Sequence, residues 1–76
     1  MSEKTLISIL KAIGPETVDM DGDPFYIFLH LTDGRLIKTA FDGITFIYGS
    51  GFIACLNETS EGTEFIPYSS IVSVSI

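Results

Sequence analysis

The histidine, the cysteine and the scattered carboxylates of this 76-residue chain form no constellation at catalytic spacing. The chain has one histidine, His30, and one cysteine, Cys55. His30 follows Phe28 and Leu29 in an apolar run, and no nucleophile-elbow pattern accompanies it. Cys55 also lies in an apolar stretch, whereas a reactive thiolate needs an electropositive, partly exposed site. The sequence therefore predicts that the protein is not an enzyme.

Three aspartates, Asp19, Asp21 and Asp23, alternate with other residues in the segment Asp-Met-Asp-Gly-Asp. Carboxylates at alternate positions are typical of the start of a calcium-binding loop. Counted from Asp19, however, the sixth position is Pro24 rather than glycine, and the twelfth is His30 rather than glutamate. We interpret the segment as a polar turn. With one histidine and one cysteine the chain also lacks the ligands of a zinc site, so no metal and no cofactor is predicted.

The residues best suited to hold a ligand are two tyrosines, a serine and two basic residues. Tyr48 and Tyr68 can stack on unpaired bases, and Ser69 can supply a hydrogen bond. Arg35 and Lys38 can reach phosphates. Each residue also has an ordinary interpretation, which is packing for the tyrosines and a solvated charge for the basic residues. Both interpretations stay open at the level of sequence.

The charge balance bears on which partners are possible. The chain has 10 acidic and 4 basic residues and a formal net charge of −6. Because phosphate neutralisation dominates nucleic-acid affinity, tight and general nucleic-acid binding is not expected. Anionic membrane surfaces are disfavoured for the same reason, and no stretch approaches the about 20 apolar residues of a membrane span. The first residues do not have the pattern of a signal peptide, so we expect a cytoplasmic protein.

One short helix is expected at the start of the chain. Ser2 can cap a helix, and Gly14-Pro15 would end it. The β-branched residues of this segment leave a strand as the alternative. Four apolar residues recur at the spacing of one helix face: Leu6, Ile9, Leu10 and Ile13. This spacing predicts a helix over residues 2–13.

The rest of the chain alternates between β-forming runs and turns. Asp33-Gly34 and Asp42-Gly43 are turn signals, Gly49-Ser50-Gly51 interrupts the chain again, and Asn57–Thr63 is polar. The pattern predicts a single domain over residues 1–76 that is mainly β, with a small bent barrel over residues 17–76. The β-forming runs are Phe25–Leu31, Leu36–Phe41, Ile44–Tyr48, Phe52–Leu56, Glu64–Ile66 and Ile71–Ile76.

The last of these runs, Ile71–Ile76, has none of the residues that normally protect the edge of a sheet. It contains no Lys, Glu, Asp or Pro. Hydrophobic residues make up 46% of a chain whose small size limits how much surface it can bury. We therefore expect this strand to pair within its own sheet on one side and with a second copy of the chain on the other.

Two stretches resemble the Sm/LSm family of small β-barrels, which includes bacterial Hfq. Leu31-Thr32-Asp33-Gly34-Arg35, which follows an apolar run, resembles the hairpin of the family's first motif. Phe65–Val74 resembles the second motif, in which a short strand, a turn and the last strand close the barrel. The resemblance implies a short N-terminal helix followed by a five-stranded, strongly bent Sm-like barrel of the SH3 type.

The resemblance also implies assembly and function. Members of the family form closed homo-oligomeric rings, here expected to contain five to seven subunits, in which the strand before the last turn pairs with the last strand of the neighbour. The family's role is RNA-binding or RNA-associated, so single-stranded RNA is the expected ligand. The residues expected to contact RNA are Tyr48, Tyr68, Ser69, Lys38 and Arg35. The residues expected at the interface between subunits are Glu64, Phe65, Ile66, Ile71, Val72, Ser73 and Val74.

A second interpretation of the ring remains open. The family's base-binding pattern, Asp-x-x-x-Asn, is not matched near Gly49-Ser50-Gly51, and every added subunit brings six further negative charges. On this interpretation the chain forms an acidic ring that serves as a scaffold or adaptor and binds protein partners instead of RNA.

Overall fold

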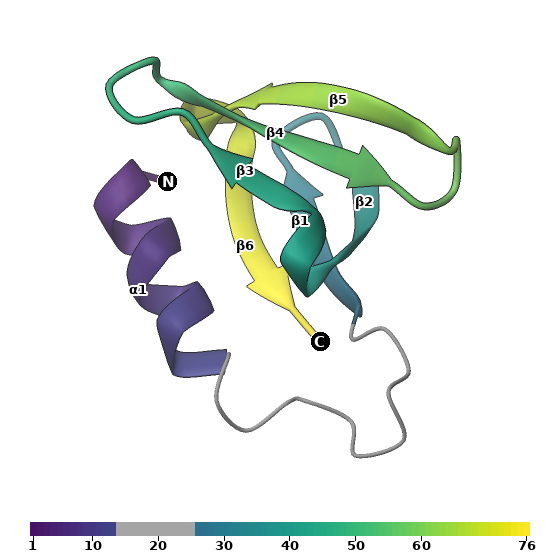
Figure 1. The fold of residues 1–76 in the computed structure, drawn as a ribbon, viewed down its shortest axis with the longest axis horizontal. Helices are drawn as coiled ribbons and strands as arrows, with labels where there is room; N and C mark the ends of the chain where they lie inside the picture. The colour runs from purple at the N-terminus through teal and green to yellow at the C-terminus, as the bar shows by residue number, and fades with distance from the viewer. Residues whose placement is uncertain (14–25) are drawn as a thin grey trace.

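The computed structural model describes residues 1–13 and 26–76, which form one helix and six strands (Figure 1). The expected helix end at Gly14-Pro15, the three aspartates and Phe25 lie outside the described residues. Two short 3-10 helices, η2 (Phe41–Gly43) and η3 (Tyr68–Ser70), separate consecutive strands. The other elements are α1 (Glu3–Ile13), β1 (Tyr26–Leu31), β2 (Leu36–Ala40), β3 (Ile44–Phe46), β4 (Phe52–Asn57), β5 (Gly62–Pro67) and β6 (Ile71–Ser75).

Helix α1 begins where the sequence predicts. The side-chain oxygen of Ser2 accepts a hydrogen bond from the backbone N–H of Thr5 at 3.1 Å, which satisfies one of the free donors of the first turn. Leu6 and Leu10, which belong to the predicted apolar face, are buried. The amino group of Met1 donates hydrogen bonds to the carbonyl oxygens of Tyr68 and Ile71. These contacts fix the start of α1 against the start of β6.

The strands form two antiparallel sheets, ordered β2-β1-β6 and β3-β4-β5. The Asp33-Gly34 turn joins β1 to β2 as predicted, and Gly34 has a φ of +86°, a conformation that glycine adopts without the strain a side chain would add. The chain passes from the first sheet to the second through η2 and returns through η3. Gly43 allows the first of these corners, because a Cβ atom there would lie 3.3 Å from Oγ1 of Thr39.

The inward faces of both sheets meet in one hydrophobic core that α1 completes. The alternation of β1 is regular, since Ile27, Leu29 and Leu31 are buried and the residues between them are only half-buried. The remaining core side chains, from the other elements, are Leu6, Leu10, Ile37, Ile53, Cys55, Ile66, Tyr68 and Ile71.

Three backbone hydrogen bonds outside the strand ladders fix the turns. The N–H of Glu58, in the β4–β5 turn, donates to the carbonyl of Lys38 on β2 at 2.8 Å and so joins the two sheets. The N–H of Thr32 donates to the carbonyl of Ser70 at 2.9 Å, and the N–H of Tyr68 donates to the carbonyl of Gly51 at 3.0 Å. These last two bonds hold η3 against the β1–β2 and β3–β4 turns.

The prediction of a mainly β fold with a short N-terminal helix is confirmed. Each of the six β-forming runs overlaps one strand, and these strands form two sheets whose pairings among the described residues do not close into a barrel. The five-stranded barrel stays a prediction. The 3-10 turn Phe41–Gly43 separates β2 from β3, which pair with β1 and β4 respectively. Within the described residues, no helix is long and apolar enough to cross a membrane.

Candidate functional site

Each sheet has two edge strands without a partner strand on their outer side among the described residues, β2 and β6 in the first sheet and β3 and β5 in the second. The two edges that carry the predicted interface residues are those of β5 and β6. Phe65 on β5 is 66% exposed and Val72 on β6 is 59% exposed. Such edges are templates for pairing with another chain, and native proteins normally protect them with charged residues or proline. The two edges are therefore the first candidate for an interaction site.

The predicted interface residues divide into two groups. Ile66 and Ile71 are buried in the core of the chain itself, so their side chains are not available to a neighbour. Phe65, Val72 and Ser73 are exposed, while Glu64 and Val74 are half-buried. In β5 the alternation of a strand explains this division, because successive side chains point to opposite faces of the sheet. In β6 the burial does not alternate, and the β1–β6 register shifts opposite Ile71 and Ser73.

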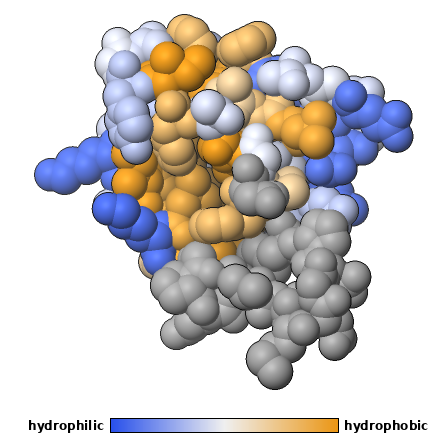
Figure 2. Space-filling model, viewed as in Figure 1, coloured by the Kyte–Doolittle hydropathy of each residue, from blue (hydrophilic) through white to orange (hydrophobic). Residues whose placement is uncertain are grey.

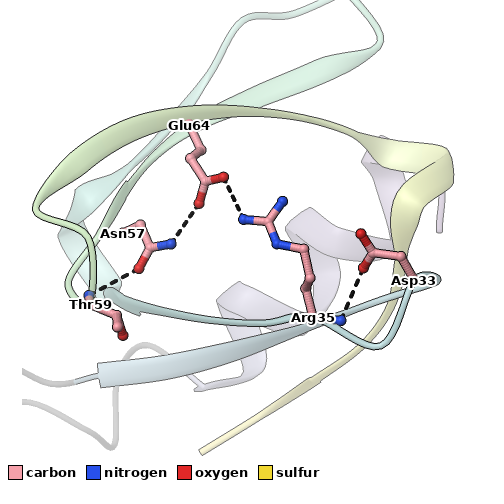
Figure 3. A network of polar contacts seen from close by, with 5 residues as sticks. All are labelled: Asp33, Arg35, Asn57, Thr59 and Glu64. Atoms are coloured by element: carbon pink, nitrogen blue, oxygen red, sulfur yellow. Dashed lines mark hydrogen bonds and ion pairs between the residues drawn. The ribbon is translucent and has the colours of Figure 1, made fainter.

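A polar network beside β5 engages one of the predicted RNA contacts (Figure 3). Nη2 of Arg35 donates a hydrogen bond to Oε1 of Glu64 at 2.6 Å, and Nδ2 of Asn57 donates to Oε2 of the same carboxylate at 2.6 Å. The backbone N–H of Thr59 donates to Oδ1 of Asn57, and that of Arg35 donates to Oδ1 of Asp33. The network ties the β1–β2 turn to β4 and β5.

The electrostatics of the network follow from these contacts. The hydrogen bonds from Arg35 and Asn57 stabilise the charged carboxylate and hold the pKa of Glu64 below its usual value. The same hydrogen bond and the charge of Glu64 raise the pKa of Arg35. A shallow cavity of about 130 Å³ lies beside this pair and is also lined by Phe65 and Pro67. Sequence spacing does not reveal the network, because 29 residues separate Arg35 from Glu64.

Lys38, the second basic candidate, is also engaged within the chain. Its ammonium group lies 4.5 Å from the centroid of the Tyr26 ring, a cation–π contact between neighbouring strands β2 and β1. Arg35 and Lys38 are therefore both engaged within the chain. They are held by different partners, Glu64 and Tyr26.

The two candidate tyrosines lie in very different environments. Tyr48, in the turn between β3 and β4, is 75% exposed and stacks on Phe46 with ring centroids 6.2 Å apart. Tyr68, in η3, is 6% exposed, and its hydroxyl has no hydrogen-bond partner among the described residues. Burial, followed by the charges of Glu3 and Tyr48, raises the pKa of Tyr68. Ser69 is exposed beside it.

A groove of about 470 Å³ lies between α1 and the β3–β4 turn. In Figure 2 hydrophilic side chains, in blue, project beside apolar surface, in orange, at the left of the molecule, where Figure 1 places α1. The sequence analysis did not select Lys4 and Lys11, although their spacing of seven residues places them on one face of a helix. The groove is lined by Glu3, Lys4, Ile7, Ser8, Lys11 and Tyr48.

The remaining reactive side chains lie apart from this groove. Nε2 of His30 and Oγ of Ser75 are 2.8 Å apart in a hydrogen bond between β1 and β6. Cys55 is buried, and burial, with a smaller contribution from Glu64, raises its pKa to about 11. The thiol therefore stays protonated and covered at neutral pH. Residues 1–13 and 26–76 contain no group of three or more His, Cys, Asp or Glu side chains that could hold a metal ion.

Among the described residues the surface thus offers unpaired strand edges, which include β5 and β6, a polar network beside β5, and a groove flanked by lysines and an exposed tyrosine. Function has to be argued from the chemistry of these features. Comparison of the chain with protein-family models, with curated proteins and with solved structures gave no match.

Proposed function

We propose that the protein assembles into a closed ring of five to seven identical subunits, in the manner of Sm/LSm proteins, with β5 of one chain paired to β6 of the next. The observation that carries this proposal is the pair of unpartnered edges at the ends of the two sheets. Phe65 and Val72, both exposed, lie on these two strands, and pairing would remove them from water.

The expected five-stranded barrel is part of the same proposal. If β2, η2 and β3 are counted as one strand that bends at Phe41–Gly43, the six strands become five. Two further features support this interpretation: η3 stands directly before the last strand, and the backbone hydrogen bond from Glu58 to Lys38 joins the β4–β5 turn of one sheet to β2 of the other. The two edges differ in sequence, so the contact is head-to-tail, and it closes only if the rotation between subunits divides a full turn evenly.

We further propose that this ring binds single-stranded RNA. Tyr48 supports this role, since its exposed ring can stack on an unpaired base whatever the sequence. A ring repeats each weak contact in every subunit, and this repetition raises the overall affinity. The acidic charge limits binding to selective contacts.

The acidic scaffold is the second candidate, and one observation favours it. Both basic residues expected to reach phosphates already have partners in their own chain, Glu64 for Arg35 and Tyr26 for Lys38. A ring of net charge −6 per subunit would then attract a basic protein surface. Anisotropy of a labelled U-rich or A-rich RNA at about 50 mM salt separates the two candidates, because the scaffold gives no RNA binding.

Light scattering of the full chain tests the ring. We expect a mass of five to seven times the 8.3 kDa of one chain. The Val72→Asp variant, which places a charge on the edge of β6, should give single chains. Leu36→Asp is the matched control, because Leu36 is 52% exposed on β2, at the opposite edge of the first sheet. A wild-type mass of 8.3 kDa at micromolar concentration, or an unchanged mass for folded Val72→Asp, would overturn the proposal.

A further inference from the structure

The groove between α1 and Tyr48 combines charged and aromatic side chains that ring assembly does not use. Two of the four basic residues of the chain, Lys4 and Lys11, lie along it. In the described residues the one ion pair is that of Arg35 with Glu64, so neither lysine is neutralised by a salt bridge there. Lys4 and Lys11 are two helical turns apart, a rise of about 10.5 Å along the axis. The groove therefore carries positive charge at two separated points of an acidic protein.

The charge of the groove is not uniform, because Glu3 also lines it. Glu3 is next to Lys4 in sequence, at the first turn of α1, and Lys11 is in the last turn. A ligand with negative charge is therefore favoured along the side of α1 from Lys4 to Lys11, and disfavoured at the end occupied by Glu3.

The wall opposite α1 is aromatic. Tyr48 stacks on Phe46 with an interplanar angle of 21°, so its orientation is supported while three quarters of its surface stays exposed. Ile7 adds an apolar contact between the lysines, and Ser8 adds a hydroxyl. Such a surface suits a planar ring that carries anionic groups on one side.

We propose that the groove between α1 and Tyr48 binds a nucleotide, with phosphate at Lys4 and Lys11 and the base against the ring of Tyr48. The volume of about 470 Å³ lies within the range of small-ligand sites. The inference rests on the proposed RNA role for its biological ligand, but the whole groove lies within one chain. The nucleotide can be free or part of single-stranded RNA, and the experiment distinguishes these sources.

The test is titration of the full-length, isotope-labelled protein with uridine monophosphate and with a U-rich hexanucleotide, followed by NMR at about 50 mM salt. We expect shifts of the backbone signals of Lys4, Ser8, Lys11 and Tyr48 with both ligands. Affinity for the hexanucleotide more than tenfold higher identifies RNA as the source, and equal affinities identify the free nucleotide. No shift at these residues with either ligand would overturn the proposal.

Variants distinguish binding in the groove from nonspecific electrostatic attraction between the protein and the ligand. Lys4→Gln/Lys11→Gln should weaken hexanucleotide binding at least about tenfold, and Tyr48→Ser should weaken binding of both ligands. Ser60→Glu is the charge control for a single lysine variant, because Ser60 is exposed in the β4–β5 turn and the change lowers the net charge by one. A loss in Ser60→Glu equal to that in Lys4→Gln or Lys11→Gln would refute specific binding in the groove.

The outcomes also distinguish this inference from the proposed function. If the ring proposal fails but the groove is correct, single chains still bind uridine monophosphate with shifts at Lys4 and Lys11. If RNA binds but Lys4→Gln/Lys11→Gln binds it equally well, the RNA role stands and the groove is refuted. An acidic peptide that displaces the nucleotide and binds more tightly would identify a protein ligand and would also overturn the proposal.

Discussion

The guanidinium group of Arg35 lies 2.6 Å from the carboxylate of Glu64, although 29 residues separate them in sequence. The contact joins the turn after β1 to β5, the strand whose outer edge is proposed to pair with a neighbour (Figure 3). The contact also engages Arg35, one of the two basic residues that the sequence predicts as phosphate contacts. The same contact therefore supports the geometry of the edge and limits the surface available to RNA.

The stability that Glu64 contributes should depend on pH. Its pKa is lowered by Arg35 and then by Asn57, so the contribution is complete above the ordinary value of 4.5 and is lost as the pH falls through the lower, folded value. Glu64→Gln should thus be less stable than wild type at pH 7, and the difference should shrink as the pH approaches 3. Urea unfolding at several pH values measures this difference. An equal difference in the free energy of unfolding between wild type and Glu64→Gln at every pH would contradict a stabilising role for the charged carboxylate of Glu64.

Cys55 should be unreactive in the folded protein. Its side chain is buried and its pKa is raised to about 11, so at pH 8 very little thiolate is present or accessible. We expect modification by a thiol reagent to proceed only as fast as the chain opens, and to become rapid in denaturant. Absorbance of the released thiolate follows the reaction. Stoichiometric labelling within seconds under native conditions would contradict the burial.

Tyr68→Phe should stabilise the free protein, because it removes a buried hydroxyl without a partner in the described residues and keeps the ring that packs in the core. The gain expected from an unsatisfied group is about 1 kcal/mol. Thermal unfolding without ligand measures this gain. A lower melting temperature for Tyr68→Phe than for wild type would contradict the absence of a partner for the hydroxyl.

Ser2→Ala should destabilise the fold by about 1 kcal/mol, the usual cost of losing an N-cap. The hydroxyl of Ser2 accepts from the N–H of Thr5 at 3.1 Å, and α1 contributes Leu6 and Leu10 to the core. Ser8→Ala is the control within the same helix. Ser8 is exposed, and its hydroxyl donates to the carbonyl of Lys4 inside the helix instead of capping the helix end. Equal destabilisation by the two variants in chemical unfolding would argue against the cap.

Much of the local structure was predictable because its causes lie within a few residues. The apolar spacing of Leu6 and Leu10 predicts α1, and Asp33-Gly34 predicts the first hairpin. Predictions were least accurate where a strand lacks an apolar pattern. β5 runs over Gly62–Pro67, whereas the sequence indicates Glu64–Ile66, because backbone pairing with β4 extends the strand through polar residues.

The candidate site was predictable only in part. Tyr48 was selected for its aromatic ring, and its exposure makes it usable, whereas Tyr68 was selected for the same reason and is buried. The partners of Arg35 and Lys38 were not foreseen. Each is a contact between strands, and a contact of that kind depends on which strands pair and in which register.

The sequence alone determined the fold class, the helix, the turns and the surplus of apolar residues, because propensity, periodicity and turn chemistry act over short stretches of chain. Tertiary structure alone decided that β5 and β6 end their sheets, that Glu64 holds Arg35, and that Tyr48 faces the lysines of α1 across a groove. These relationships join segments far apart in the chain. They are set by how two sheets and a helix share one core, and no local pattern of residues encodes them.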